Sequence, residues 1–215
     1  MNSGRRRHGR LVAIEGIDGS GKSTVVPALA RVLRRRGLSV AVRREPADAA
    51  LGSLAQRAGA VDPWTGAIYF TLDRFAARPR LVRDLERHDL VLTDRSFYST
   101  LAYQGSSLPP AAYRRLAELQ RRATIVPDRV VLLEIPLREA ARRRAGRARS
   151  RGPLEGSAVQ RRVAGAYRRL ARQGRWWVVD ATRPSHEVVG ELAGRLGPVP
   201  RSGRRRAGSR ARRRR

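Results

Sequence analysis

The sequence contains no cysteine, only one lysine and no long apolar run. Without cysteine, disulfide bonds and thiolate metal sites are excluded, which agrees with a reducing compartment. No apolar stretch reaches the roughly 18 residues of a membrane-spanning helix, so no membrane association is predicted. The basic N-terminus is not followed by an apolar segment, so we expect no secretory signal and a cytoplasmic location.

Arginine supplies almost all of the positive charge. Lysine and arginine together number 47 against 18 acidic residues, which gives a net charge of +29. Such a charge favours nucleic acid, anionic surfaces or anionic substrates as partners. Residues 201–215 hold nine arginines, and no aromatic side chain interrupts them to stack on bases. Because like-charge blocks repel, we predict disordered basic tails at 1–9 and 198–215 around one domain at 10–197.

The single lysine lies in a glycine-rich loop. An apolar run from Leu11 to Ile14 is followed, from Gly16 to Ser23, by the spacing Gly-x-x-x-x-Gly-Lys-Ser. This is the spacing of a phosphate-binding loop, in which glycines bring backbone N–H groups close to phosphate. Lysine then reaches the β- and γ-phosphates, and the serine hydroxyl ligates Mg²⁺. The alternative is a glycine-rich turn that merely contains a lysine. We predict contacts to the phosphates of a bound nucleotide from Gly16, Ile17, Asp18, Gly19, Ser20, Gly21, Lys22, Ser23 and Thr24.

Strand-like and helix-like segments alternate along the rest of the chain. This alternation predicts an α/β fold in which a parallel sheet is covered by helices on both faces. The predicted strands are 10–15, 38–42, 89–93, 129–135 and 176–179. The first helix should begin in the glycine-rich loop and run to about residue 36, and residues 47–60 should form a short helix and a loop. Further helices are expected at 63–87, near 96, and at 110–123, 137–145, 157–172 and 187–196. An arginine- and glycine-rich loop is expected at 146–156.

Polar side chains follow the predicted strands. Because parallel strands end at one edge of a sheet, these side chains should converge on one cleft. Asp94 has the position of the acidic residue that holds Mg²⁺ in phosphate-loop proteins, although a helix N-cap is the alternative. Arg44 and Arg95 could clamp phosphate or could be solvated. The convergent set is Glu15, Arg44, Glu45, Asp94, Arg95, Glu134 and Asp180.

Residues 142–151 form the most arginine-dense interior stretch. In phosphoryl transfer, charge spreads over the phosphoryl oxygens and positioned cations stabilise it. This stretch therefore predicts an arginine-rich lid over the cleft, with a solvated basic loop as the alternative.

Taken together, the sequence resembles the thymidylate kinase family, a group of nucleoside monophosphate kinases, over residues 10–197. The resemblance rests on the phosphate loop and on three further motifs. It implies the phosphate-loop nucleotide-kinase fold with a five-stranded parallel sheet, Mg²⁺ with ATP as donor, dTMP as acceptor, and dTDP and ADP as products in dTTP synthesis. It also implies a homodimer. The further motifs are Arg44-Glu45-Pro46, Phe70 with Arg74, and Asp94-Arg95 followed by Ser99 and Ala102-Tyr103-Gln104-Gly105.

The same resemblance assigns roles to single residues on the acceptor side. Phe70 would stack on thymine, for which core packing is the alternative, and Arg74 would hydrogen-bond the carbonyl edge of the base. Arg44 and Arg95 would hold the acceptor phosphate. The base and sugar pocket would be lined by Ser99, Tyr103 and Gln104.

On the donor side, Ser23 and Asp94 would hold Mg²⁺ and Asp18 would lie near the phosphates. Family members take a catalytic arginine either from the phosphate loop or from the lid. Here the loop has none, so the resemblance implies the lid type, with Arg147 the first candidate, Arg149 and Arg151 close behind, and Arg143 at the lid base contacting ATP. The implied catalytic set is Lys22, Arg95, Arg147 and Asp18.

Two segments depart from the family pattern. Ala47-Asp48-Ala49 stands where Gly-Gly-Thr is usual, and the lid lacks the usual Asp-Arg-x-Glu run. Two other functions stay open at this point: a related kinase for another deoxynucleotide or nucleoside, and a weakly active nucleotide-binding protein whose basic tails bind nucleic acid.

Overall fold

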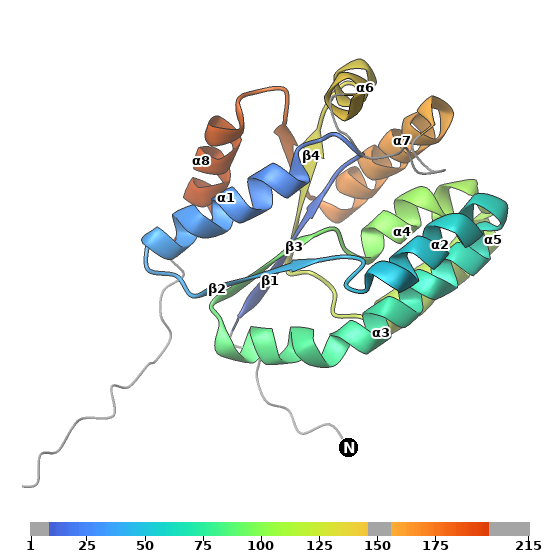
Figure 1. Cartoon of the computed structure of the whole chain (residues 1–215), viewed down its shortest axis with the longest axis horizontal. Coiled ribbons are helices and arrows are strands. Elements are labelled where there is room, and N and C mark those ends of the chain that lie inside the picture. The colour runs from blue at the N-terminus through green and yellow to red at the C-terminus, as the bar shows by residue number, and fades with distance from the viewer. Residues whose placement is uncertain (1–8, 146–155, 198–215) are drawn as a thin grey trace, which may run out of the picture.

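Five parallel strands form the centre of the molecule (Figure 1). The structure, a computed structural model, describes residues 9–145 and 156–197. The strand order is β2-β3-β1-β4-β5, which confirms the predicted five-stranded parallel sheet. The strands are β1 (Arg10–Glu15), β2 (Val40–Arg44), β3 (Leu90–Asp94), β4 (Arg129–Glu134) and β5 (Trp177–Asp180). The helices are α1 (Lys22–Arg35), α2 (Ala49–Val61), α3 (Pro63–Arg87), α4 (Phe97–Tyr103), η1 (Gly105–Ser107), α5 (Pro110–Ala123), α6 (Leu137–Ala145), α7 (Ser157–Gly174) and α8 (Ser185–Leu196).

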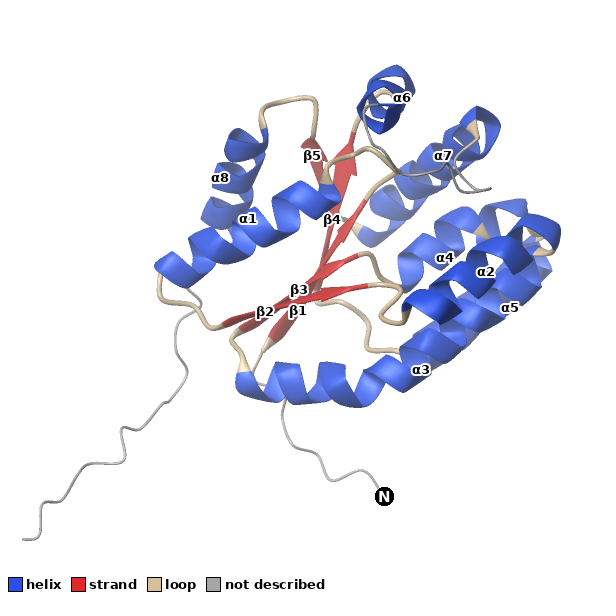
Figure 2. Ribbon diagram, viewed as in Figure 1, coloured by secondary structure: helices blue, strands red, loops and turns tan. Residues whose placement is uncertain are grey.

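The central strand, β1, is buried on both faces. Val12 and Ile14 pack in one hydrophobic cluster with α1 and α8, whereas Ala13 packs in a second cluster with α4, α5 and α7. Figure 2 shows these helices on opposite sides of the sheet. Alternate residues therefore face different helix layers, which explains why the strand is apolar throughout rather than alternating.

The order in which strands are added to the sheet reverses at β1. Strand β1 pairs with β3 on one side and with β4 on the other, so β2 and β3 lie to one side and β4 and β5 to the other. Ligands of open parallel sheets bind beside the carboxyl ends of the strands at such a reversal point. The glycine-rich loop leaves β1 at this place.

Several predicted boundaries were displaced. Strand β2 begins two residues later than predicted because Gly37 (φ +86°) ends the helical segment and the Ser39 N–H is held by Asp89 Oδ2 at 2.8 Å. Arg44 therefore lies in β2 and not after it. Strand β3 likewise includes Asp94. The region predicted as a short helix with a loop is mostly one helix, α2, and its N-cap Asp48 accepts from the Leu51 N–H.

The helices predicted at 63–87, 110–123 and 137–145 have those bounds in the structure. Helices α7 and α8 are each two residues longer than predicted, at the C-terminal and N-terminal ends respectively. Within 9–145 and 156–197, no helix has both the length and the apolarity needed to cross a bilayer. The predicted tails, apart from Gly9, lie outside the described residues, as do residues 146–151 of the predicted lid, whereas residues 142–145 belong to α6.

Candidate active site

The glycine-rich loop has the backbone geometry that an anion site requires. Gly16, Gly19 and Gly21 have φ values of 148°, 90° and 94°, which residues with a β-carbon rarely adopt. Gly21 is the N-cap of α1 and has no side chain with which to cap it. The first N–H groups of α1 therefore point at the loop without a side-chain acceptor, as in sites that bind phosphate.

Lys22 folds back over this loop. Its Nζ donates to the carbonyl oxygens of Gly16 at 2.8 Å and Ile17 at 3.0 Å. The side chain is buried, and burial together with the nearby charge of Arg95 lowers the pKa of Lys22 to about 8. Its hydrogen bonds inside the loop place the ammonium where bound phosphates would replace the carbonyl oxygens as acceptors.

The carboxylate of Asp18, in the middle of the loop, is held by side chains from outside the loop. Oδ1 forms an ion pair with Arg95, and Oδ2 accepts from the Tyr103 hydroxyl at 2.9 Å. Burial raises the pKa of Asp18, but the charges of Arg95 and Lys22 and these hydrogen bonds outweigh burial and lower it to about 2. Asp18 is therefore ionised at neutral pH and orients the Arg95 guanidinium.

The backbone of Asp18 is held by Gln160, which the sequence did not identify, and by Arg144, which lies in the predicted arginine-dense stretch. The Asp18 N–H donates to Gln160 Oε1 at 3.3 Å, and the Asp18 carbonyl accepts from Arg144 NH1 at 2.7 Å. Gln160 Nε2 also donates to the Asp18 carboxylate at 3.2 Å. Helices α6 and α7, which flank residues 146–155, thus both contact the phosphate loop.

Glu15, at the carboxyl end of β1, is engaged by side chains from three other segments. The side chain is fully buried, and its Oε1 accepts from both the N–H and the hydroxyl of Ser96 at 2.7 Å. Oε2 accepts from the hydroxyls of Ser99 and Tyr167 at 2.8 Å. This carboxylate therefore joins β1 to the β3–α4 loop, α4 and α7.

Arg95 has an unusual backbone. Its φ is +75°, and non-glycine residues in this region carry strain that is typical of functional sites. The conformation is held by the Arg95 N–H on the Ile14 carbonyl at 3.0 Å and by the Thr93 hydroxyl on the Arg95 carbonyl at 2.8 Å. The guanidinium contacts Ser99 Oγ at 3.2 Å and lies 5.3 Å from the Tyr103 ring centre.

The site suits Mg²⁺ that arrives with the nucleotide. Asp94 is 7% exposed, and its Oδ1 has no hydrogen-bond partner among the described residues. The N-cap of α4 is Ser96, so the alternative role of Asp94 as a helix cap is excluded. Ser23 lies exposed in the first turn of α1. Within 9–145 and 156–197, no group of three or more His, Cys, Asp or Glu side chains is arranged to hold a metal ion by itself, which fits a cation bound mainly by phosphates and water.

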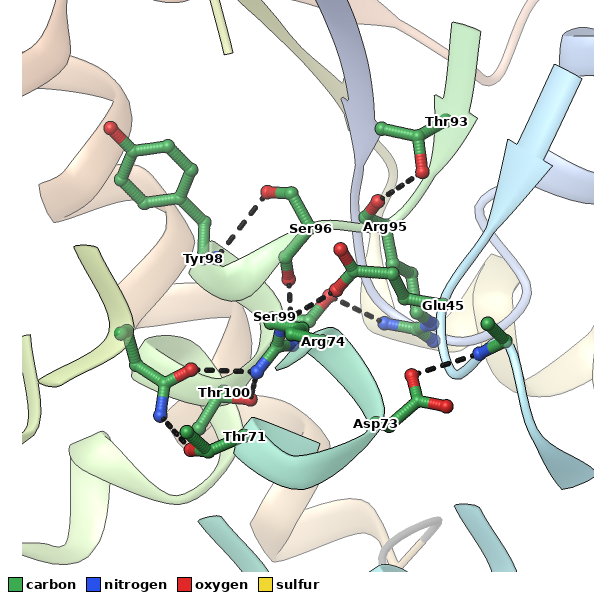
Figure 3. A network of polar contacts seen from close by, with 12 residues as sticks. Glu45, Thr71, Asp73, Arg74, Thr93, Arg95, Ser96, Tyr98, Ser99 and Thr100 are labelled. Atoms are coloured by element: carbon green, nitrogen blue, oxygen red, sulfur yellow. Dashed lines mark hydrogen bonds and ion pairs between the residues drawn. The ribbon is translucent and has the colours of Figure 1, made fainter. Parts of the chain in front are cut away.

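Helix α3 presents the predicted base-binding residues. Phe70 is half-buried and is absent from the hydrophobic clusters of the described chain, which disfavours the core-packing alternative. One turn later, Arg74 is buried, and its Nε donates to Glu45 Oε2 at 2.8 Å (Figure 3). NH2 of Arg74 reaches the Ser96 carbonyl at 3.3 Å.

Asp73 explains how the departing Ala47-Asp48-Ala49 segment is positioned. The Asp73 carboxylate is buried, and it accepts from the N–H of Ala47 at 2.9 Å and of Asp48 at 2.7 Å. The segment after Glu45-Pro46 is therefore tied to α3 directly beside Arg74, without the glycines usual in the family.

The remaining predicted residues lie elsewhere along the chain, on β2, after α4 and on α6. Arg44 is exposed and lies opposite Asp94 in the sheet register. Gln104 is buried, and its Oε1 has no partner in the described part of the chain. Arg143 pairs with Glu139 at 2.8 Å, and its NH1 lies 3.9 Å from where a β-carbon on Gly21 would stand. The predicted lid arginines Arg147, Arg149 and Arg151 lie outside the described residues.

A phosphate loop lies where the strand order reverses in the five-stranded parallel sheet, Arg95 of the β3–α4 loop pairs with it, and Arg74 of α3 bonds the next residue, Ser96. This arrangement defines a phosphate-loop kinase of small phosphorylated substrates. The family model for thymidylate kinase matches residues 14–192. The chain is 40% identical over 210 residues to the thymidylate kinase of Thermomicrobium roseum, covering 91% of this chain and 98% of that protein. It is 36% identical over 208 residues to the thymidylate kinase of Leifsonia xyli, with the same coverage. The chain belongs to the thymidylate kinase family.

Proposed function

We propose that the chain transfers the γ-phosphoryl group of ATP to dTMP, giving dTDP and ADP. The site has a donor half, which is the phosphate loop, and an acceptor half, which is built around α3. The observation that supports the proposal most directly is that two adjacent residues, Arg95 and Ser96, each contact one half. Arg95 pairs with Asp18 of the phosphate loop, while the carbonyl of Ser96 accepts from Arg74 on α3. A donor bound at the loop and a pyrimidine monophosphate bound at α3 would therefore meet at the β3–α4 loop.

The donor half positions charge. Lys22 moves from the loop carbonyls to the β- and γ-phosphates, and Arg143 approaches from α6. Mg²⁺, held by Ser23 and Asp94, would neutralise charge on the phosphate oxygens. Arg147 supplies the further cation from the lid. Because the transition state is loose, these cations stabilise the phosphoryl oxygens without covalent participation by the protein.

The acceptor half orients the nucleotide. Phe70 stacks on the base, Arg74 donates to its carbonyl edge, and Arg44 and Arg95 bind the phosphate. Asp18 keeps the Arg95 guanidinium directed at the space between donor and acceptor. Tyr103 lines the sugar side, where its ring disfavours a ribose 2′-hydroxyl.

Gln104 lines the same pocket through its Oε1, which has no hydrogen-bond partner among residues 9–145 and 156–197. Ser99 acts from below, since its hydroxyl is already engaged with Glu15 and the Arg95 guanidinium.

A coupled assay of ADP release tests the proposal. With Mg²⁺ and ATP, we expect the highest kcat/KM for dTMP in a panel with dUMP, dCMP and thymidine, and no turnover when Mg²⁺ is chelated. A higher kcat/KM for another member of the panel would support the related-kinase alternative. ATP binding without transfer to any of them, with DNA binding lost on removal of residues 201–215, would support the nucleic-acid alternative.

We also propose that two copies associate through α2 and α3. Ile68, Leu72 and Phe75 form an exposed apolar stripe along one face of α3, and Leu54 and Val61 on α2 are exposed as well. Contiguous exposed apolar side chains of this kind mark interaction surfaces. Light scattering should give twice the monomer mass, and Leu72→Asp should give the monomer. A monomeric wild-type protein at micromolar concentration would reject the dimer.

A further inference from the structure

A chain of buried polar side chains joins α3 to α5. Gln120, on α5, is fully buried, and its Oε1 accepts from Arg74 NH1 at 2.7 Å. Its Nε2 donates to Thr71 Oγ1 at 2.7 Å, and the Thr71 hydroxyl donates to the Ala67 carbonyl at 2.7 Å. A buried amide is costly unless both of its ends are satisfied, and here both are.

This chain fixes which way the Gln120 amide points. The only hydroxyl hydrogen of Thr71 is committed to the Ala67 carbonyl, so Thr71 Oγ1 can only accept from Gln120. Gln120 must therefore direct its NH₂ group at Thr71 and its carbonyl at Arg74. The opposite orientation would set N–H against N–H at Arg74.

Arg74 has few hydrogens left for a ligand. A guanidinium has five N–H donors. Nε donates to Glu45, the two NH1 hydrogens to Thr100 at 3.0 Å and Gln120, and one NH2 hydrogen to the Ser96 carbonyl. Figure 3 shows Thr71, Arg74 and Thr100 side by side in this network. A single NH2 hydrogen is without a partner among residues 9–145 and 156–197.

We propose that Gln120 is a positioning residue for pyrimidine selection: its carbonyl holds the Arg74 guanidinium so that one N–H faces the edge of the base that carries the 4-substituent. This inference rests on the proposed function. A keto oxygen at position 4 accepts that N–H, whereas an amino group presents its own hydrogens to it. A fixed donor cannot turn away from an amino group, and sites that are built to hydrogen-bond one group strongly reject the analogue that lacks it.

Two variants at one position separate orientation from packing. Gln120→Met keeps length and apolar volume but removes the acceptor for Arg74. Gln120→Glu keeps an acceptor toward Arg74, and the Thr71 hydroxyl can rotate to donate to its second oxygen. Each variant is assayed with dTMP and with 5-methyl-dCMP, which differ in the group at position 4 and in the hydrogen on N3. The N3 difference is the same for wild type and variants, so a change in the ratio reports the change at Gln120. The affinity for dTMP is also measured by calorimetry.

For Gln120→Met we expect the ratio of kcat/KM for dTMP to that for 5-methyl-dCMP to fall about tenfold or more, through a raised KM for dTMP. Gln120→Glu should retain the ratio within about threefold. If both variants keep the wild-type ratio, Gln120 only ties α3 to α5 and the inference is wrong. If Gln120→Met does not fold, Thr71→Val, which frees the amide to turn, should lower the ratio in the same direction, and an unchanged ratio there would overturn the inference. A wild-type protein that does not phosphorylate dTMP would reject the proposed function itself.

Discussion

The two halves of the site are built in different ways. The donor half is a contiguous loop of backbone amides and carbonyls between β1 and α1, in which three glycines and Lys22 supply most of the geometry. The acceptor half is assembled from side chains of α3, α4 and α5 that are buried and hydrogen-bonded to one another. A triphosphate needs only N–H groups and positive charge, whereas a base must be distinguished from similar bases.

The difference implies separable effects of mutation. Changes in the donor half should lower turnover with any acceptor, since they act on the transferring phosphoryl group. Changes in the acceptor half should act on the KM for dTMP and on the choice of base. Residues that join the halves, above all Glu15 and Asp18, should affect both.

The largest effect is expected for Lys22→Ala. The ammonium stabilises charge on the phosphoryl oxygens, so we expect kcat to fall by about 10²–10³, roughly 3–4 kcal/mol of transition-state stabilisation. Steady-state assays with saturating dTMP measure it. Arg35→Ala, at the exposed far end of α1, is the matched control and should be near wild type. Near-normal turnover of Lys22→Ala would remove the donor half from the mechanism.

The next largest effect is expected for Glu15→Leu, which should lower the stability of the fold. The change leaves the Ser96 N–H and three hydroxyls buried without their acceptor, so we expect a loss of about 3 kcal/mol in the free energy of unfolding. Urea denaturation measures it. Glu118→Ala, which removes a carboxylate that is 64% exposed, should change the free energy by less than about 0.5 kcal/mol. Equal stability of the two variants would show that the junction between the halves is unimportant.

The donor half and the acceptor half were also unequal in how far the sequence predicted them. The loop was predicted residue by residue because its function needs neighbours in the chain, and Asp94 was predicted because it closes a buried strand. The partners of Glu15 were missed, since Tyr167 lies 152 residues away and a polar residue on an amphipathic helix has no local signal. Asp73 and Gln120 were missed for the same reason. The thymidylate kinase family, the parallel sheet and the kinase reaction were predicted and are confirmed, while the roles of single residues stay predictions.

Phe70→Ala sharpens the comparison from the acceptor side. Loss of stacking on the base should raise the KM for dTMP about tenfold, since base–aromatic stacking contributes roughly 1–3 kcal/mol. The KM for ATP should not change. Arg83→Ala is the control, because this arginine is exposed near the end of the same helix and lies outside the proposed dimer surface. An unchanged KM for dTMP, or an equal change in both variants, would assign Phe70 a role outside the base pocket.

The smallest expected effect is the uptake of a proton by Lys22 when ATP binds to the donor half. Because burial lowers the pKa of Lys22 to about 8, about half of the unliganded protein holds a neutral amine at pH 8. Bound phosphates favour the charged form and raise this pKa, so ATP binding should take up about 0.5 proton at pH 8 and almost none at pH 6, and affinity should fall as the pH rises through 8. Calorimetry in buffers of different ionisation enthalpy measures the uptake. Lys22→Arg stays charged throughout and should show no uptake from this position, and dTMP binding to the acceptor half should show much less than ATP binding at pH 8. Equal uptake by Lys22→Arg would assign the proton to another group.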